Sequence, residues 1–338
     1  NAGVIHADSA VREGGRVFLR ASGDLKTSAG SDIGANGTTG GRVELIADGA
    51  AVIDGRVSAT GSAGRGGYVD TSGHQSLDVV NVPVVGRGGE WHIDPYDIEI
   101  VASGSNGAVT GTSAIVSTES GAQLSADTVI AQLNAGVNVS ITTGAGNPGT
   151  DPWQGNITVS AAIAKTGSAE STLTLNANNN IYINAPITSA NSALTLNLNS
   201  NRQDDYPGAD HAVQLNANLN LRGGVLTVSE GSAGAGNGTL DILSGTTTLG
   251  QPTSAIHAAM VNVRPGATLA LNRAGSALAG TLNNDGRVPV GSGAGRAVLD
   301  HGGRHGGTFN AAAGTTLAML GGHGFTGSSA FTGAGTID

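Results

Sequence analysis

The sequence contains no cysteine, only two methionines and two lysines, and few aromatic residues. Aromatic residues make up 3% of the 338 residues and charged residues 12%, about half of the ~25% usual in soluble domains. The absence of cysteine excludes disulfides, and it is compatible with a protein that must stay unfolded during export. The scarcity of aromatic and charged residues is unusual for a compact enzyme, which normally builds its pocket from both. We therefore expect a protein that is not an enzyme.

Charge and hydropathy exclude further classes. The net charge is −9, and the basic residues form no stripe, which disfavours nucleic-acid binding. The sequence has no apolar run of ~18 residues, so we expect no membrane insertion. The mean hydropathy of +0.01 argues against disorder. The chain starts at Asn1 without a basic and apolar leader, and both ends interrupt a pattern, so we expect a fragment of a longer protein.

A repeat organises the amino-terminal part of the chain. The stretches GGRVFL, GGRVEL and GGYVDT begin at Gly14, Gly40 and Gly66, which places them 26 residues apart. Each period holds short strands with alternating apolar residues; in GRVELIA, Val43 and Leu45 share one face. No helix separates these strands, and the Gly-Gly pairs suit tight corners. Short strands at a fixed period predict an all-β fold, a parallel β-helix or solenoid of roughly 13–16 coils.

The same rhythm continues in the carboxy-terminal half. Residues 171–201 alternate cleanly, with apolar positions at Leu173, Leu175, Ile181 and Ile183. The many asparagines there are expected to form stacked ladders or to bond to neighbouring backbone at the corners. One segment breaks the pattern: residues 124–141 begin with a short helix near 125–135. Ser125 is the expected N-cap and Gly136 the expected end, with an apolar stripe of Val129, Ile130 and Leu133.

Residues 66–100 resemble a known family. Two motifs carry the resemblance, GGYVDTSGH and W-x-x-DP-x-D-I-x-I. Their residues are Gly66, Gly67, Tyr68, Val69, Asp70, Thr71, Ser72, Gly73 and His74, then Trp91, Asp94, Pro95, Asp97, Ile98 and Ile100. They resemble the two-partner-secretion exoproteins, which include filamentous haemagglutinin-like proteins and high-molecular-weight adhesins. The resemblance covers about the first 200 residues well, whereas the rest is similar only in its general pattern of strands and turns.

The resemblance implies a right-handed β-helix, export through an outer-membrane transporter partner, and adhesion or matrix attachment outside the bacterial cell. The family's amino-terminal secretion domain, with its Asn-Pro-Asn motifs, is absent from this sequence. The fragment would therefore start at or after the end of that domain.

The stretch that most resembles a metal or acid–base site is GGEWHIDPYDIEI, residues 88–100. Trp91 and Ile93 alternate with polar residues, and the alternation resumes after a corner at Pro95. The acids Asp94 and Asp97 then lie at different corners and do not converge. We interpret Trp91, Asp94, Pro95 and Asp97 as a structural junction rather than a metal or acid–base site, with Trp91 filling the core.

Two other polar segments are candidate sites. Asp204, Asp205, Tyr206 and Asp210 form the densest polar loop; they could bind Ca²⁺ or a glycan, or form a solvated turn. Near the end of the chain, His301 and His305 have the spacing of a helical metal pair, with His323 downstream. The intervening Gly-Gly makes a helix unsuitable, so a flexible corner is the preferred interpretation.

Catalytic motifs fit poorly. A polysaccharide-cleaving β-helix would need clustered carboxylates, but the Asp-Asp at Asp204 and the Gly-His-Gly at Gly322 are far apart in sequence. The Gly-x-Gly-x-x-Gly match at Gly144 has no helix after it, so dinucleotide binding is rejected. We expect no cofactor, with Ca²⁺ as the one candidate ion.

These observations give three expected regions: β-helix coils over residues 1–100, an irregular insertion with a short helix over 101–170, and further coils over 171–338. The expected function is a secreted, cell-surface adhesin segment that attaches to glycans, host cells or biofilm matrix. The alternatives are a passive stalk that presents a distal toxin or binding tip, a haem-acquisition exoprotein and, last, a polysaccharide-degrading enzyme.

Overall fold

The computed structural model describes residues 2–10, 14–103, 113–118, 121–144, 155–200, 213–222, 224–230, 237–249, 255–272 and 277–338. The chain divides into two compact units, residues 1–163 with 167–178 and residues 164–166 with 179–338. Strand makes up 55% of the structure and helix 3%, arranged as a parallel β-solenoid of about 12 turns with one short helix. The predicted fold class is thereby confirmed.

The first unit contains sixteen of the described strands and the helix. They are β1 (Val4–His6), β2 (Arg16–Ala21), β3 (Leu25–Thr27), β4 (Asp32–Gly34), β5 (Arg42–Ala47), β6 (Ala50–Ile53), β7 (Arg56–Ser58), β8 (Tyr68–Gly73), β9 (Ser76–Val79), β10 (Glu90–Asp94), β11 (Ile98–Val101), β12 (Ile115–Thr118), β13 (Gly121–Ser125), α1 (Ala126–Asn134), β14 (Asn138–Thr142), β15 (Ile157–Val159) and β17 (Ser171–Asn176).

The second unit contains the remaining strands, the first of which begins one residue before it. They are β16 (Ile163–Lys165), β18 (Ile181–Ile183), β19 (Ile187–Ser189), β20 (Leu194–Ser200), β21 (Val213–Leu215), β22 (Leu219–Asn220), β23 (Val225–Glu230), β24 (Thr239–Ile242), β25 (Thr246–Leu249), β26 (Ala255–Val263), β27 (Thr268–Leu271), β28 (Ala277–Asn284), β29 (Arg287–Val290), β30 (Arg296–Leu299), β31 (Gly303–His305), β32 (Thr308–Ala311), β33 (Thr316–Met319), β34 (His323–Phe325), β35 (Ala330–Gly333) and β36 (Thr336–Ile337).

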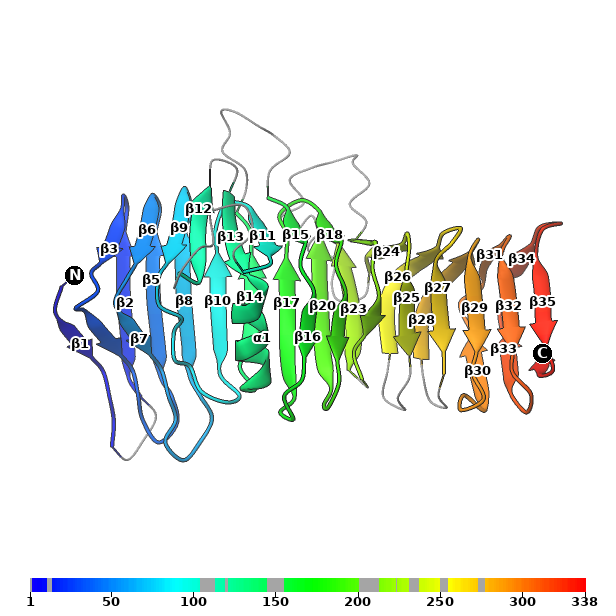
Figure 1. The fold of residues 1–338 in the computed structure, drawn as a ribbon, viewed down its shortest axis with the longest axis horizontal. Helices are drawn as coiled ribbons and strands as arrows, with labels where there is room; N and C mark the ends of the chain where they lie inside the picture. The colour runs from blue at the N-terminus through cyan, green and yellow to red at the C-terminus, as the bar shows by residue number, and fades with distance from the viewer. Residues whose placement is uncertain are drawn as a thin grey trace. The chain divides into compact units, whose positions relative to one another are not determined.

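Three stacks of strands build the coils of the first unit. One runs β2, β5, β8, β10, β14 and β17, parallel throughout, and Figure 1 shows its first four strands side by side in chain order. The second stack begins β3, β6, β9, and the third is β1, β4, β7. The residues that alternate in sequence also alternate in burial: Val43, Leu45 and Ala47 of β5 are fully buried. The predicted alternation is confirmed here.

Gly-Gly pairs mark the sharp corner before the first four strands of this stack, β2, β5, β8 and β10. A Cβ on Gly41 would lie 2.2 Å from the carbonyl oxygen of Gly15, and one on Gly67 would lie 2.1 Å from that of Gly41. The backbone approaches so closely because each corner residue's carbonyl accepts a hydrogen bond from the next coil; Arg42 N and Tyr68 N are 3.0 and 2.9 Å from the oxygens of Gly15 and Gly41. Only glycine fits these corners.

An antiparallel hairpin interrupts the second stack. Strand β12 pairs antiparallel with both β9 and β13, and β13 then pairs parallel with β11. The register of β10 with β14 pairs Trp91 with Val139. This coil therefore contains 48 residues, whereas the coil from β2 to β5 contains 26. Such long turns account for fewer coils than the sequence period predicts.

Helix α1 follows β13 directly and contacts β14, as Figure 1 also shows. Val129 and Leu133 are buried, and Gly136 ends the helix with a φ of 77°. The predicted helix is therefore confirmed, and so is the position of its N-cap at Ser125. Ser125 has the extended backbone of an N-cap without a side-chain cap bond, and its hydroxyl instead pairs with Ser103 at 2.6 Å.

The second unit has the same coil construction, with a ladder of polar side chains that links successive coils. One of its sheets is β16-β19-β22-β25-β27-β29-β32-β35. The side chains of Asp241, Asn262 and Asn283 bond in succession, each step 2.8 Å, and the Asn283 oxygen accepts from Arg304 N at 3.0 Å. The expected bonding of asparagines to each other and to neighbouring backbone is found.

Candidate functional site

The junction around Pro95 is held by its own hydrogen bonds. Trp91 is fully buried, and its Nε1 donates to Thr71 Oγ1 at 3.0 Å. Asp97 Oδ1 accepts from the backbone N–H groups of Gly155 and Asn156 at 2.5 and 2.6 Å. Asp94 is half-buried at the end of β10, in register with Ser72. Trp91 thus lies in the core, and one carboxylate oxygen of Asp97 fixes the adjoining coil.

A polar hollow of about 300 Å³ lies beside this junction, lined in part by Asp97, Glu99, Gln123 and Asn156. Its two carboxylates are already engaged, because Glu99 Oε1 accepts from Ser160 Oγ at 2.5 Å and Asp97 holds two backbone amides. These bonds occupy both carboxylates, so the hollow offers little negative charge that is free to bind a ligand.

Asp204, Asp205, Tyr206 and Asp210 lie outside the described residues. In the part of the chain that the structure describes, no group of three or more His, Asp or Glu side chains could hold a metal ion. Helix α1, the one helix in this part of the chain, has nine residues, too few to span a bilayer.

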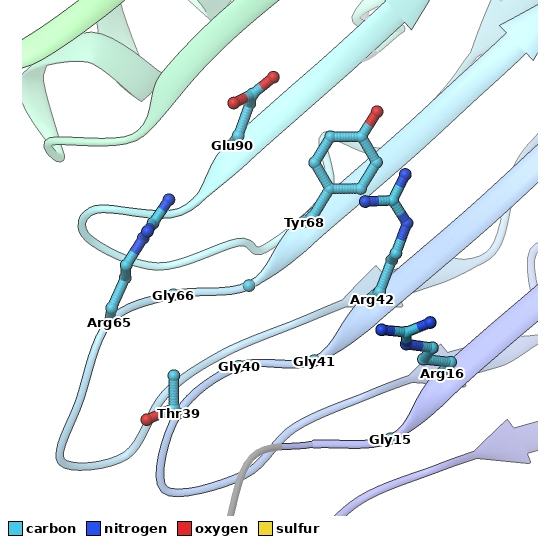
Figure 2. A pocket seen from close by; sticks show the side chains of 11 residues that line it. Gly15, Arg16, Thr39, Gly40, Gly41, Arg42, Arg65, Gly66, Tyr68 and Glu90 are labelled. Atoms are coloured by element: carbon cyan, nitrogen blue, oxygen red, sulfur yellow. The ribbon is translucent and has the colours of Figure 1, made fainter.

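A groove of about 260 Å³ lies along the glycine corners of the first unit (Figure 2), and we call it the glycine-corner groove. Its floor is backbone, since the corner glycines carry no side chains. Its walls are the side chains of Arg16, Thr39, Arg42, Arg65, Tyr68 and Glu90. A narrow backbone floor between polar walls makes a site open to an extended ligand.

Strand register sets the order of these side chains. Arg16 of β2 pairs with Arg42 of β5, Arg42 with Tyr68 of β8, and Tyr68 with Glu90 of β10. Figure 2 shows the four side chains rising from the starts of successive strands. Each follows its glycine corner immediately, at steps of 26, 26 and 22 residues, so each coil contributes one residue to the same column.

Arg42 is fixed by two neighbours. It forms an ion pair with Glu44, and its guanidinium carbon lies 3.9 Å from the centre of the Tyr68 ring. The His92 ring lies nearly parallel to the Tyr68 ring, with centroids 6.3 Å apart. Tyr68 is thus placed between Arg42 and His92, where it positions the guanidinium.

A buried carboxylate supports this arrangement from below. Asp70 is buried and accepts hydrogen bonds from Ser72 Oγ at 2.5 Å and Tyr68 Oη at 3.3 Å. Burial raises the pKa of Asp70, while the neighbouring His92 opposes this shift. Burial also raises the pKa of Tyr68, so its hydroxyl stays protonated and can donate to Asp70 at any physiological pH.

The other two arginines are more available. Arg65 is exposed and donates from Nε to the Gly88 carbonyl at 2.5 Å, which leaves its terminal nitrogens free of that bond. Arg16 is exposed, and among the described residues none forms a hydrogen bond or ion pair with its side chain. Arg16 and Arg42 are in register on adjacent strands, so an anion between them could contact both guanidinium groups.

Sequence reasoning missed this groove. It noted the Gly-Gly repeat for its backbone conformation and assigned no role to Arg16, Arg42 or Arg65. The signal was present, because Gly-Gly-Arg occurs at both residues 14–16 and 40–42, with Gly-Gly-Tyr at 66–68.

The histidines near the end of the chain differ from the expected flexible corner. His305 ends β31 and is fully buried, with its Nε2 2.9 Å from His323 Nδ1. His323 Nε2 faces the carbonyls of Leu320 and Leu299, at 3.1 and 3.3 Å, so it carries a proton. His305 Nε2 is then the donor in the pair. The Gly302 and Gly303 backbones, with φ of 76° and 150°, turn the chain so that His305 points inward.

Acidification is expected to destabilise the second unit through His305. Burial and the neighbouring His323 lower the pKa of His305 to about 4, with Asp285 opposing. Between that value and the ordinary ~6.5, the unfolded chain binds a proton that the folded chain does not, so the free energy of unfolding falls as the pH falls. The stabilisation is fully present above pH ~6.5, and about 3 kcal/mol is lost by pH ~4.

Denaturant titrations between about pH 7 and pH 4 measure this effect. A His305→Leu variant should lose this component of the pH dependence, whereas His301→Gln, which alters an exposed histidine of the same segment, should retain it. An identical pH dependence in the wild type and both variants would show that His305 does not contribute.

In comparisons with known proteins, no family model and no curated sequence matched this chain.

Proposed function

We propose that this chain is a non-catalytic segment of a secreted bacterial adhesin, exposed on the cell surface, that attaches the cell to glycans. The observation that carries the proposal is the glycine-corner groove, where three guanidinium groups line an open backbone floor. Guanidiniums and flanking carboxylate and hydroxyl oxygens can hydrogen-bond the hydroxyl and acidic groups of a saccharide. The resemblance of residues 66–100 to two-partner-secretion exoproteins supports the same proposal, with export through an outer-membrane transporter.

The coil construction also supports attachment rather than turnover. Repeated coils display short polar side chains and asparagine ladders over extended faces, and solenoids commonly use such surfaces for binding. In the groove, Arg42 and Tyr68 are held by neighbours and need little reorganisation to bind. Preorganised side chains lose less entropy when a ligand binds.

Binding of the purified chain to a panel of bacterial and host glycans tests the proposal. We expect specific binding to acidic members of the panel, with and without added Ca²⁺. The control is the same chain after thermal unfolding, which retains its composition but loses the groove.

Two other outcomes are informative. Absence of binding under both conditions would contradict the adhesin proposal and favour a passive stalk that presents a distal toxin or tip. Binding that requires Ca²⁺ would move the site away from the groove and toward the acidic segment of Asp204, Asp205 and Asp210.

A further inference from the structure

We propose that the glycine-corner groove binds a linear polyuronate, an acidic polysaccharide with one carboxylate on each sugar ring, laid across successive coils. This inference rests on the proposed attachment function and names the class of glycan. It follows from the spacing of the cations, their unequal neutralisation and the acceptors that lie between them.

The spacing of cations comes from the strand register. Arg16 and Arg42 are partners on adjacent parallel strands, which lie ~4.8 Å apart. This register brings two guanidinium groups within reach of one short anionic ligand. The carboxylates of a polyuronate chain that crosses these coils can therefore pair with both groups.

The neutralisation of the cations is unequal. Arg42 is already paired with Glu44, whereas Arg16 has no described partner and Arg65 uses only its Nε. Carboxylates bind guanidinium groups through two parallel hydrogen bonds, a geometry that Arg16 and the free edge of Arg65 can supply. A ligand with spaced single charges suits this set better than one with dense charge.

The remaining wall of the groove favours free hydroxyl groups. Glu90 and Thr39 line it with oxygen acceptors. The hydroxyls of a uronate ring can donate to these oxygens, whereas a sulfated sugar would place additional negative charge next to Glu90. The overall net charge of −9 acts in the same direction, because it disfavours densely charged polyanions.

The backbone floor lets such a ligand approach. Gly41 and Gly67 are held to glycine because their virtual Cβ atoms would lie 2.2 and 2.1 Å from backbone oxygens of the preceding coil; at Gly15 the virtual Cβ would lie 2.8 Å from the Ala7 Cβ. The same absence of side chains leaves the space between the two walls open along three coils. The corner that the fold requires is thus also the channel in which the sugar chain lies.

Titration calorimetry with a galacturonic acid hexamer, in chelator to remove Ca²⁺, tests the inference. We expect Arg16→Ala to weaken binding by about tenfold, the loss of one charge-assisted pair. The matched control is Arg20→Ala, which removes the same charge from the same face of β2, where Arg20 contacts Asp48 at 3.4 Å. This control should bind within about twofold of the wild type, as expected for loss of an exposed ion pair.

Two comparison ligands separate uronate recognition from general attraction to charge. The fully methyl-esterified hexamer, which has no carboxylates, should not bind. A sulfated dextran oligomer of equal charge should bind more weakly than the uronate. Equal affinity for the sulfated oligomer, or equal losses in Arg16→Ala and Arg20→Ala, would overturn the inference.

These experiments distinguish failure of the polyuronate inference from failure of the proposed attachment function. If the hexamer does not bind while the chain still binds other glycans of the panel, only the polyuronate inference fails. If no glycan of any class binds, the attachment function fails with it.

Discussion

Replacing Gly67 with alanine is expected to destabilise the first unit by about 3 kcal/mol or more. The added Cβ would lie 2.1 Å from the Gly41 carbonyl oxygen and 2.8 Å from the Gly40 carbonyl carbon. Both are backbone atoms within a hydrogen-bonded stack of coils, so they cannot move aside as a flexible side chain would. Because the same corner recurs in adjacent coils, relaxation at Gly67 would also disturb Gly41.

The measurement is denaturant unfolding, followed by Trp91 emission in a background where Trp153 is replaced by phenylalanine. Trp91 reports on the first unit alone, which matters because two units need not unfold together. The matched control is Gly30→Ala, since a Cβ at Gly30 meets nothing within 4 Å. This control should change stability by less than about 1 kcal/mol, with the sign expected to be stabilising. Equal destabilisation by Gly67→Ala and Gly30→Ala would contradict the close backbone contact at the Gly67 corner.

Truncation of Trp91 to alanine is expected to cost about 3–5 kcal/mol, the range for a large aromatic side chain in a packed core. Trp91 is fully buried between Val69 and Val139 of the adjacent strands, so no neighbour can fill the space without a backbone shift. Its indole N–H also bonds to Thr71 Oγ1 at 3.0 Å.

Trp91→Phe separates packing from hydrogen bonding. It keeps an aromatic ring but leaves Thr71 Oγ1 without its donor, so we expect a loss of about 1–3 kcal/mol. Adding Thr71→Val should recover part of that loss, because the acceptor that lost its indole donor is then removed; the 3.3 Å bond from the Thr71 hydroxyl to the His92 carbonyl is lost with it and limits the recovery. Unfolding is followed by circular dichroism, since the fluorophore is changed. A Trp91→Ala cost no larger than that of Trp91→Phe would contradict a core position for this residue.

The coils could be predicted from sequence because their determinants are local. Alternating residues such as Val43 and Leu45 specify a half-buried strand wherever they occur, and the corner glycines recur at a fixed period. Helix α1 was predictable for the same reason, from Val129 and Leu133 at helical spacing and Gly136 at its end. These features need no knowledge of distant contacts.

The hairpin β12–β13 could not be predicted, because it depends on non-local pairing. Its insertion between β9 and β11 reverses strand direction within an otherwise parallel stack, and no residue type in 115–125 encodes that partner choice. The hydrogen bonds from Gly155 and Asn156 to Asp97 join residues about sixty positions apart.

The candidate site was partly accessible. The repeat of Gly-Gly-Arg aligns Arg16 with Arg42, and a period of 26 residues would have placed Tyr68 in the same column. Arg65 was not accessible, because a turn brings it to Gly88. His305 was assigned to a corner because of its glycine neighbours, whereas those glycines redirect the chain so that the imidazole enters the core.

The most direct test of the central claim, that the glycine-corner groove is the attachment site, is adhesion under flow. Beads carrying the chain are passed over a surface coated with polygalacturonate. The double variant Arg16→Ala/Arg65→Ala is compared with Arg20→Ala/Arg56→Ala, which removes two exposed charges outside the groove. Loss of adhesion in the first variant, with near wild-type adhesion in the second, is the predicted result. Equal adhesion of the two variants would contradict the account.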